Sequence, residues 1–214
     1  VEGLRGSDTV TGRHLDDRAR LGRVLARMGQ ARRQTGDHEG AMAAGQQALA
    51  LAAALGDSAL QVQASYSLGL ASYALGDFGR AAALLRQNVE AADREAGTLS
   101  TDLWIRSQSW LALTLSDLGA FAEGRRYGEE ALRLATLAGR EAIAIIVHGC
   151  LGSLYLAQGD LEPAIRVSEQ GLALCRASGN RDWLRGTAAS LGTAAARQGR
   201  LAEAGALLEE AIRE

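Results

Sequence analysis

The sequence has 214 residues, 47% of them hydrophobic, so it can bury a core and is not expected to be disordered. Aromatic residues make up only 4%, alanine and leucine dominate the apolar set, and there is one proline, which together favour helices over strands. The formal net charge is −2, and every basic residue is an arginine. This balance gives no electrostatic basis for binding nucleic acid or an anionic membrane, and no apolar run reaches the roughly 18 residues of a membrane span.

A turn centred on glycine recurs along the chain and indicates an internal repeat. Its copies are spaced by 40, 43, 40 and 40 residues. Seven residues before each turn glycine lies a small residue that follows an apolar one, and five residues after it lies another small residue. The apolar–small pairs and turn glycines are Met28-Gly29 with Gly36, Leu68-Gly69 with Gly76, Leu111-Ala112 with Gly119, Leu151-Gly152 with Gly159, and Leu191-Gly192 with Gly199. Small residues at matched heights let two antiparallel helices approach closely, so each copy is predicted to be a helical hairpin.

The spacing predicts ten helices in chain order. They cover residues 19–35, 38–55, 58–75, 78–96, 100–118, 121–138, 140–158, 161–178, 181–198 and 201–213. The turn glycines supply the left-handed conformation that ends a first helix, and Asp37, Asp77 and Asp160 stand where an N-cap oxygen is needed. Pro163 falls in the first turn of its helix, where its missing amide hydrogen costs nothing.

Two domain regions are expected. Residues 1–17 contain Gly3, Gly6 and Gly12 without a sustained period, which predicts an irregular or frayed lead-in. Residues 18–214 are expected to form one helical repeat domain. The longest break within it is the stretch Gly97–Thr101, which accounts for the 43-residue spacing.

This pattern resembles the tetratricopeptide repeat (TPR) family over about residues 19–214, through its Leu-Gly pairs, Tyr155, the Gly-Asp-aromatic turn and the following alanine. The family repeat has about 34 residues, so each hairpin here carries about six more, which implies two longer helices. The resemblance implies an all-α, right-handed superhelical solenoid of five antiparallel hairpins. The long period resembles the repeat regions of large bacterial signalling and regulatory proteins.

No constellation of catalytic or metal-ligating residues is found. His14, His38 and His148 lie far apart and lack a partner at metal-ligand spacing, and a P-loop is impossible without lysine. Adjacent acids such as Glu129-Glu130 diverge on a helix. Cys150 is expected to be a buried free thiol, as is Cys175, because antiparallel helices would offset the two by about 10 Å. The chain is therefore expected to be neither an enzyme nor a holder of metal or cofactor.

A solenoid offers a concave groove lined by the first helix of each hairpin, and this is where such repeats bind partners. By the family's register, the groove positions fall on Arg23, Gln30, Arg33, Gln63, Tyr66, Tyr73, Arg106, Ser109, Asp117, Ser153, Thr193 and Arg197. Trp104 and Trp183 lie near the starts of two first helices, where an indole could anchor a ligand or pack at the helix entrance. The same alternative, ligand contact or core, applies to Tyr66 and Tyr73.

The leading interpretation is a non-catalytic protein-interaction or scaffold module of a larger cytoplasmic bacterial regulatory protein, which binds a peptide or partner domain in its groove. One alternative is a small-ligand sensor that relays occupancy to an attached ATPase, cyclase or DNA-binding module. Another is a purely structural oligomerisation arm.

The last helix carries a broad apolar face, made of Leu201, Ala204, Leu207, Leu208, Ala211 and Ile212. Solenoids usually finish with a polar capping helix. We therefore expect self-association through a solenoid end, most simply a homodimer about a two-fold axis, or a parent protein that continues past Glu214.

Overall fold

The computed structural model describes residues 3–94 and 101–213, with the side chains of residues 16–91 and 101–213. These residues form ten α-helices, and no strand occurs among them. The chain divides into two compact units, Val1–Ser100 and Thr101–Glu214. We describe each unit by itself.

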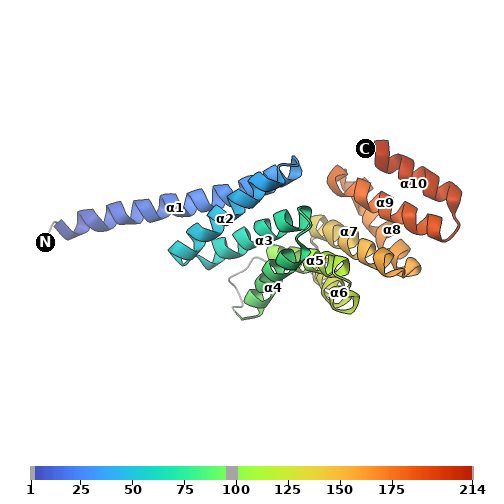
Figure 1. Cartoon of the computed structure of the whole chain (residues 1–214), viewed down its shortest axis with the longest axis horizontal. Helices are drawn as coiled ribbons and strands as arrows, with labels where there is room; N and C mark the ends of the chain where they lie inside the picture. Colours follow the sequence, from blue (N-terminus) through green and yellow to red (C-terminus); the bar gives the residue numbers. More distant parts are fainter. Residues whose placement is uncertain (1–2, 95–100, 214) are drawn as a thin grey trace. The chain divides into compact units, whose positions relative to one another are not determined.

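The first unit contains two antiparallel hairpins (Figure 1). Its helices are α1 (Gly3–Gln34), α2 (His38–Leu55), α3 (Ser58–Ala74) and α4 (Phe78–Arg94). The first helices α1 and α3 pack on each other, and each also packs on the second helix of its own hairpin. Helix α2 additionally packs on α3, so the second hairpin covers the first.

The second unit contains three hairpins arranged by the same rule. Its helices are α5 (Thr101–Asp117), α6 (Phe121–Leu137), α7 (Glu141–Gln158), α8 (Leu161–Ser178), α9 (Arg181–Arg197) and α10 (Leu201–Arg213). The first helices α5, α7 and α9 form a row in which α7 contacts both neighbours. Helices α6 and α8 each pack on the first helix of the next hairpin, α7 and α9 respectively.

The predicted helices are confirmed to within one or two residues over most of the chain, and so are five hairpins. The predicted ends at residues 95–96 and 100, and most of the break at 97–101, lie outside the described residues. The expectation of an irregular segment over residues 1–17 is wrong for residues 3–17, because α1 includes them. That residues 18–214 form one domain stays a prediction.

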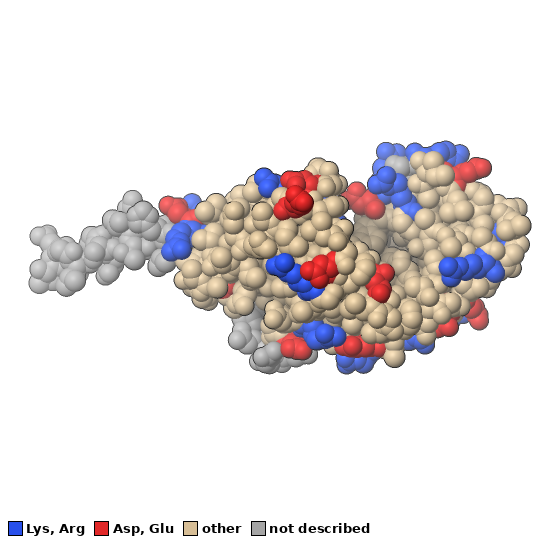
Figure 2. Space-filling model, viewed as in Figure 1, with Lys and Arg blue, Asp and Glu red and all other residues tan. Residues whose placement is uncertain are grey.

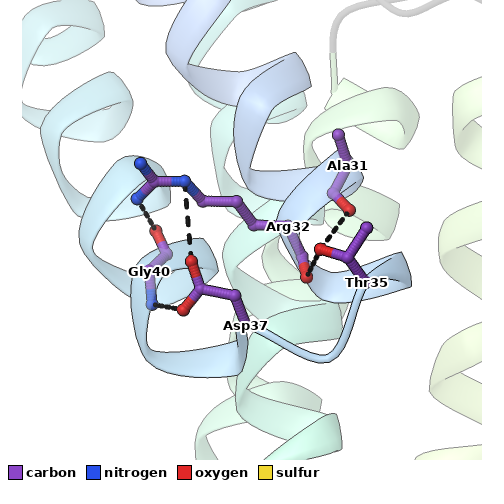
Figure 3. Close-up of polar contacts among 5 residues, drawn as sticks. All are labelled: Ala31, Arg32, Thr35, Asp37 and Gly40. Carbon is purple, nitrogen blue, oxygen red and sulfur yellow. Dashed lines mark hydrogen bonds and ion pairs between the residues drawn. The ribbon is translucent and has the colours of Figure 1, made fainter.

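The turns explain where the helices begin and end. Among the described residues, eight glycines at helix ends have a positive φ, including Gly36 at 84° and Gly159 at 89°. Asp37 caps α2 by accepting a hydrogen bond from the Gly40 amide at 2.9 Å, and Arg32 joins both residues to α1 (Figure 3). Asp77 accepts from the Arg80 amide in the same way.

The predicted cap at Asp160 is wrong. Its side chain makes no capping hydrogen bond, although helix α8 begins at the next residue. The carboxylate instead accepts a hydrogen bond from the guanidinium of Arg125 on α6. An ion pair between hairpins therefore replaces the local cap at this turn.

Small residues set the distance between the helices of a hairpin. A Cβ placed on Gly124 would lie 2.8 Å from the backbone oxygen of Ala112 and 2.9 Å from Leu154 Cδ1. A Cβ on Gly29 would lie 3.2 Å from the backbone oxygen of Ala41. Backbone atoms cannot move away as a flexible side chain can, so these positions require a residue without a side chain or a wider hairpin.

Both cysteines are free and buried, which confirms the prediction that they are unpaired. Burial raises the pKa of the Cys150 thiol well above its ordinary value. His148 is also buried, at 6% exposure, beside Gly171 of α8. Burial lowers the pKa of His148, and a hydrogen bond to the Val167 backbone opposes that shift.

Replacing Gly124 with Ala should lower the free energy of unfolding by about 1–3 kcal/mol, because the new methyl meets backbone atoms. Gly186→Ala is the matched control: a Cβ there meets nothing within 4 Å, and alanine in a helix is about 0.5–1 kcal/mol better than glycine. Denaturant titrations of both variants measure the difference. Equal stability of the two variants would contradict the close contact at Gly124.

His148 should make the protein less stable in mild acid. Because its pKa is lowered on folding, the unfolded chain takes up a proton first as the pH falls through the ordinary value of 6.5. The loss of stability continues until the pH lies below the folded pKa. Unfolding free energies at about pH 7.5 and about pH 5 should differ less in His148→Gln than in the wild type. The same pH dependence in both proteins would show that His148 does not contribute.

Candidate functional site

In the first unit, the predicted groove residues lie along α1 and α3. The Gln30 side chain donates a hydrogen bond to Ser67 Oγ at 3.3 Å, and Ser67 donates to the backbone oxygen of Ala26 at 3.2 Å. Arg23 is exposed. This side of the α1–α3 pair is therefore polar. Two of its polar side chains, Gln30 and Ser67, make hydrogen bonds that join the two helices.

The two tyrosines predicted for this surface differ in their surroundings. Tyr66 is only 4% exposed, which leaves little of its ring for a partner. The ring of Tyr73 packs against Phe78 at the α3–α4 turn, with centroids 5.3 Å apart. Tyr73 is half-buried and keeps some accessible surface.

In the second unit, two indoles meet over the middle first helix. Trp110 of α5 and Trp183 of α9 contact edge to face, with ring centroids 5.8 Å apart. The ring of Trp183 lies directly on Gly149 of α7, because a Cβ placed on Gly149 would come within 2.5 Å of its Cε3. Both indoles are half-buried. We call Trp110 and Trp183 the tryptophan pair.

The surroundings of the tryptophan pair are small and polar. Ser153, one turn after Gly149 on α7, donates to the Gly149 backbone oxygen at 2.9 Å and lies 3.3 Å from Ser190 Oγ on α9. Farther along α9, the Arg197 guanidinium donates to the backbone oxygen of Leu156 at 3.0 Å. The hydroxyl groups of Ser153 and Ser190 therefore lie about one helical turn from Gly149, where Trp183 contacts α7.

Charged side chains flank Trp110 along α5. Arg106 and Asp117 lie four residues before and seven residues after it, so they share its side of the helix. Arg106 is half-buried and Asp117 is exposed. Groups of both signs thus lie beside the indole.

A second polar cluster joins α6, α7 and α8. Tyr155 donates a hydrogen bond to Glu129 at 2.7 Å, and the guanidinium of Arg125 lies over its ring at 5.3 Å from the centroid. Burial first, and then the hydrogen bond to Glu129, raise the pKa of Tyr155 to about 12. These groups hold hairpins together and satisfy one another, so we assign them a structural role.

The structure brings some sequence candidates together and separates others. Trp183, Ser153 and Arg197 lie within one connected surface of the second unit. Trp104 lies six residues before Trp110 and therefore on another side of α5. Of the remaining candidates, Arg33 and Gln63 are half-buried on the first helices of the first unit, and Thr193 is half-buried on α9. Ser109 of α5 is buried, so the prediction that it lines a groove is wrong.

Sequence reasoning missed Trp110 and Gly149. The signal for the second was present, since the repeat register places Ala26, Tyr66, Ser109 and Ala189 at the position of Gly149. A glycine among larger residues indicates that something approaches the helix closely there. The partner that approaches could not be deduced, because it comes from another hairpin.

The described residues were also compared with what a metal site, a surface of one charge sign or a membrane span would require. No group of three or more His, Cys, Asp or Glu side chains that could hold a metal ion occurs among them. Both acidic and basic side chains occur on the face seen in Figure 2, among a larger number of uncharged residues. Of the helices described, only α7 is long and apolar enough to cross a membrane by length and composition, and 61% of it is buried in the chain, as in a core helix.

Comparisons with known proteins agree with this architecture. The family model described as the MalT-like TPR region matches residues 22–213. No curated protein sequence matches the chain. Among solved structures, BtubC (BKLC) from P. vanneervenii is similar at 21% identity, with a TM-score of 0.68 and coverage of 94% of this chain and 89% of that one.

Two further structures have much longer chains. The Rap conjugation gene regulator of the plasmid pLS20, in complex with the Phr* peptide, matches at 15% identity and a TM-score of 0.73. That match covers 86% of this chain and 50% of that one. The apo quorum sensor NprR from B. thuringiensis matches at 18% identity and a TM-score of 0.68, covering 98% of this chain and 60% of that one. At these identities the likeness shows the fold.

Gly149→Ala should displace the Trp183 ring and separate the tryptophan pair, because the new methyl would overlap Cε3. We expect a changed near-ultraviolet circular dichroism spectrum and a loss of about 1–3 kcal/mol of stability. Gly205→Ala, where a Cβ meets nothing within 4 Å, is the control. An unchanged aromatic spectrum in Gly149→Ala would mean that the indole does not lie on this glycine.

Proposed function

The chain belongs to the family of MalT-like TPR regions, and from this premise we propose that it is a non-catalytic protein-interaction module. It binds an extended peptide or a segment of a partner protein on the row of first helices α5, α7 and α9. The tryptophan pair is the observation that carries the proposal, because two half-buried indoles form an apolar binding surface beside polar groups.

The chemistry of this surface favours a peptide with an apolar or aromatic anchor. Trp side chains dominate the energy of many protein interfaces, since they bury a large area while ordering few torsions. The hydroxyl groups of Ser153 and Ser190 lie beside the pair, where they can meet a peptide backbone. Arg106 and Asp117 lie on either side of Trp110 along α5 and carry opposite charges, so they can fix the orientation of a bound peptide.

The structural neighbours support a peptide as the occupant. The Rap regulator of pLS20 was solved in complex with the Phr* peptide, and NprR is described as a quorum sensor. This chain covers 50% and 60% of those chains. We accordingly infer that it acts as the binding part of a larger cytoplasmic bacterial regulator, in which partner binding is relayed to an attached module.

Selection of short random peptides on the intact chain tests this proposal. Peptides that bind should share an apolar or aromatic side chain, and the double variant Trp110→Ala/Trp183→Ala should weaken them by about tenfold or more. Circular dichroism of the double variant should report nearly unchanged helix content.

Leu137→Ala provides the control, because Leu137 is 73% exposed and is the last residue of α6, a helix that carries none of the proposed binding residues. Binding that survives in the tryptophan double variant but fails in this control would place the site elsewhere. A chain that selects no peptide but gains thermal stability from a small metabolite would favour the small-ligand sensor instead.

A further inference from the structure

We propose that the tryptophan pair is held together only while His148 is neutral, so that protonation of His148 in mild acid separates the two indoles and weakens the binding of a peptide. The effect on binding rests on the proposed function, whereas the separation of the indoles does not. The proposal is carried by a buried contact of α7, α8 and α9, in which His148 lies beside the residues that position Trp183.

The His148 side chain lies where three helices meet. A Cβ placed on Gly171 of α8 would lie 2.7 Å from His148 Cβ and 3.4 Å from Thr187 Cγ2 of α9. Because Gly171 has no side chain, α8 comes close to both residues. His148 is 6% exposed and Thr187 is 1% exposed. We call His148, Gly171 and Thr187 the histidine junction.

One ring nitrogen of His148 has no partner in the histidine junction. Nδ1 is buried and makes no hydrogen bond to any described residue. The hydrogen bond to the Val167 backbone therefore uses Nε2, which must carry a proton to donate to a carbonyl oxygen. A second proton would bind at Nδ1, and it would place a charged N–H group where the structure offers it no acceptor.

The titratable groups nearest to the histidine junction on α7 and α8 are two buried thiols. Burial raises the pKa of Cys175, although the Thr187 hydroxyl opposes that shift, and burial also raises the pKa of Cys150. Both thiols are therefore neutral in mild acid. The charged residues of the three helices that come closest to the junction in sequence are all exposed: Glu141 of α7, Arg166 and Glu169 of α8, and Asp182 and Arg185 of α9.

The other two helices that pack on α7, α5 and α6, lie beside His148 through apolar residues. The residue before His148 belongs to a buried cluster that includes Ile105, Ala131, Ala135 and Val147. The acidic groups nearest on these two helices are bound by other residues: Glu129 by Tyr155, Glu130 by Arg133, and Asp102 by Arg140. An imidazolium at position 148 would thus be a buried charge without a partner.

Neutral and protonated His148 therefore favour different arrangements. The neutral ring fits the junction, whereas the imidazolium is stabilised by water. Burial lowers the pKa of His148 in the packed arrangement, and the Val167 hydrogen bond opposes that shift. As the pH falls through the ordinary value of 6.5 toward the lowered value, the packed arrangement consequently loses stability relative to an open, hydrated one.

The histidine junction is directly connected to the tryptophan pair. His148 precedes Gly149, on which the ring of Trp183 lies. Thr187 follows Trp183 by about one turn of α9, and its hydroxyl oxygen would lie 3.7 Å from a Cβ on Gly149. A movement of α7 relative to α9 that admits water to His148 would therefore shift Trp183 on Gly149 and break its edge-to-face contact with Trp110.

The fold does not need an ionisable group at the position of His148. The repeat register places four other residues there, namely Leu25, Ser65, Gln108 and Ala188. All four are buried. None of these side chains titrates between about pH 5 and about pH 8. At this register position, sensitivity to pH is therefore confined to α7, the helix that Trp183 contacts.

Nuclear magnetic resonance of the intact chain from about pH 8 to about pH 5 tests the separation of the indoles without any peptide. The indole N–H signals of Trp110 and Trp183 should shift with the midpoint at which the His148 ring titrates, and that of Trp104 should not. In His148→Gln the tryptophan signals should stay constant. Glutamine fits this position, because Gln108 occupies it on α5 at 2% exposure.

His38→Gln is the matched control, because His38 belongs to the first unit. It should respond to pH as the wild type does. Helix content measured on each protein at each pH separates a local opening from loss of the fold. If the glutamine variant of His148 loses helix content, His148→Leu repeats the test with the residue type found at Leu25.

A selected peptide that has blocked ends and no His, Asp or Glu tests the effect on binding. Its Kd should rise about fivefold or more between about pH 7.5 and about pH 5.5 in the wild type and stay nearly constant in His148→Gln. By reciprocal linkage, the bound peptide should lower the titration midpoint of His148.

Tryptophan signals that do not change with pH while His148 titrates, or that titrate equally in His148→Gln, would overturn the proposal and leave the proposed peptide site intact. A His148 ring that stays neutral over the whole range would overturn it too. Indoles that separate in acid while the Kd stays constant would instead overturn the effect on binding, and they would count against the tryptophan pair as the peptide site.

Discussion

Close contact between helix backbones at small residues is the constraint on which this structure depends. At Gly29, Gly124 and Gly192 a Cβ would meet the backbone oxygen of the opposite helix at 3.2, 2.8 and 3.3 Å. These three residues lie at corresponding heights in their hairpins, so the hairpins share one spacing and can stack on one another. The neighbouring leucines fill the grooves that this spacing leaves.

The same constraint shapes the surfaces on which the protein can act. Gly149 leaves room on α7 for an indole from α9, and that indole reaches Trp110 of α5. The side chains of the first helices α5, α7 and α9 thereby form an aromatic surface, and no loop or inserted element is needed.

The hairpins could be predicted from the sequence because the residues that end each helix act locally. Left-handed glycines such as Gly36 and Gly159 end helices wherever they occur, and their spacing alone sets the period. The extension of α1 back to Gly3 was missed because residues 1–17 contain glycines and show no sustained period, although each glycine lowers helix stability by only about 1 kcal/mol.

Contacts between hairpins were beyond the reach of the sequence. Asp160 has the position of a cap but binds Arg125, which lies 35 residues away. The tryptophan pair joins helices that are not neighbours in the row, so the spacing of Trp110 and Trp183 gave no sign of it. Such pairings depend on which faces the stacking brings together.

Nuclear magnetic resonance of the three indole N–H groups measures the central claim most directly, because the chain contains three tryptophans. Titration with a selected peptide should shift the signals of Trp110 and Trp183 and leave that of Trp104 nearly unchanged. A shift confined to Trp104, or tight binding that moves none of the three signals, would contradict a binding surface built on the tryptophan pair.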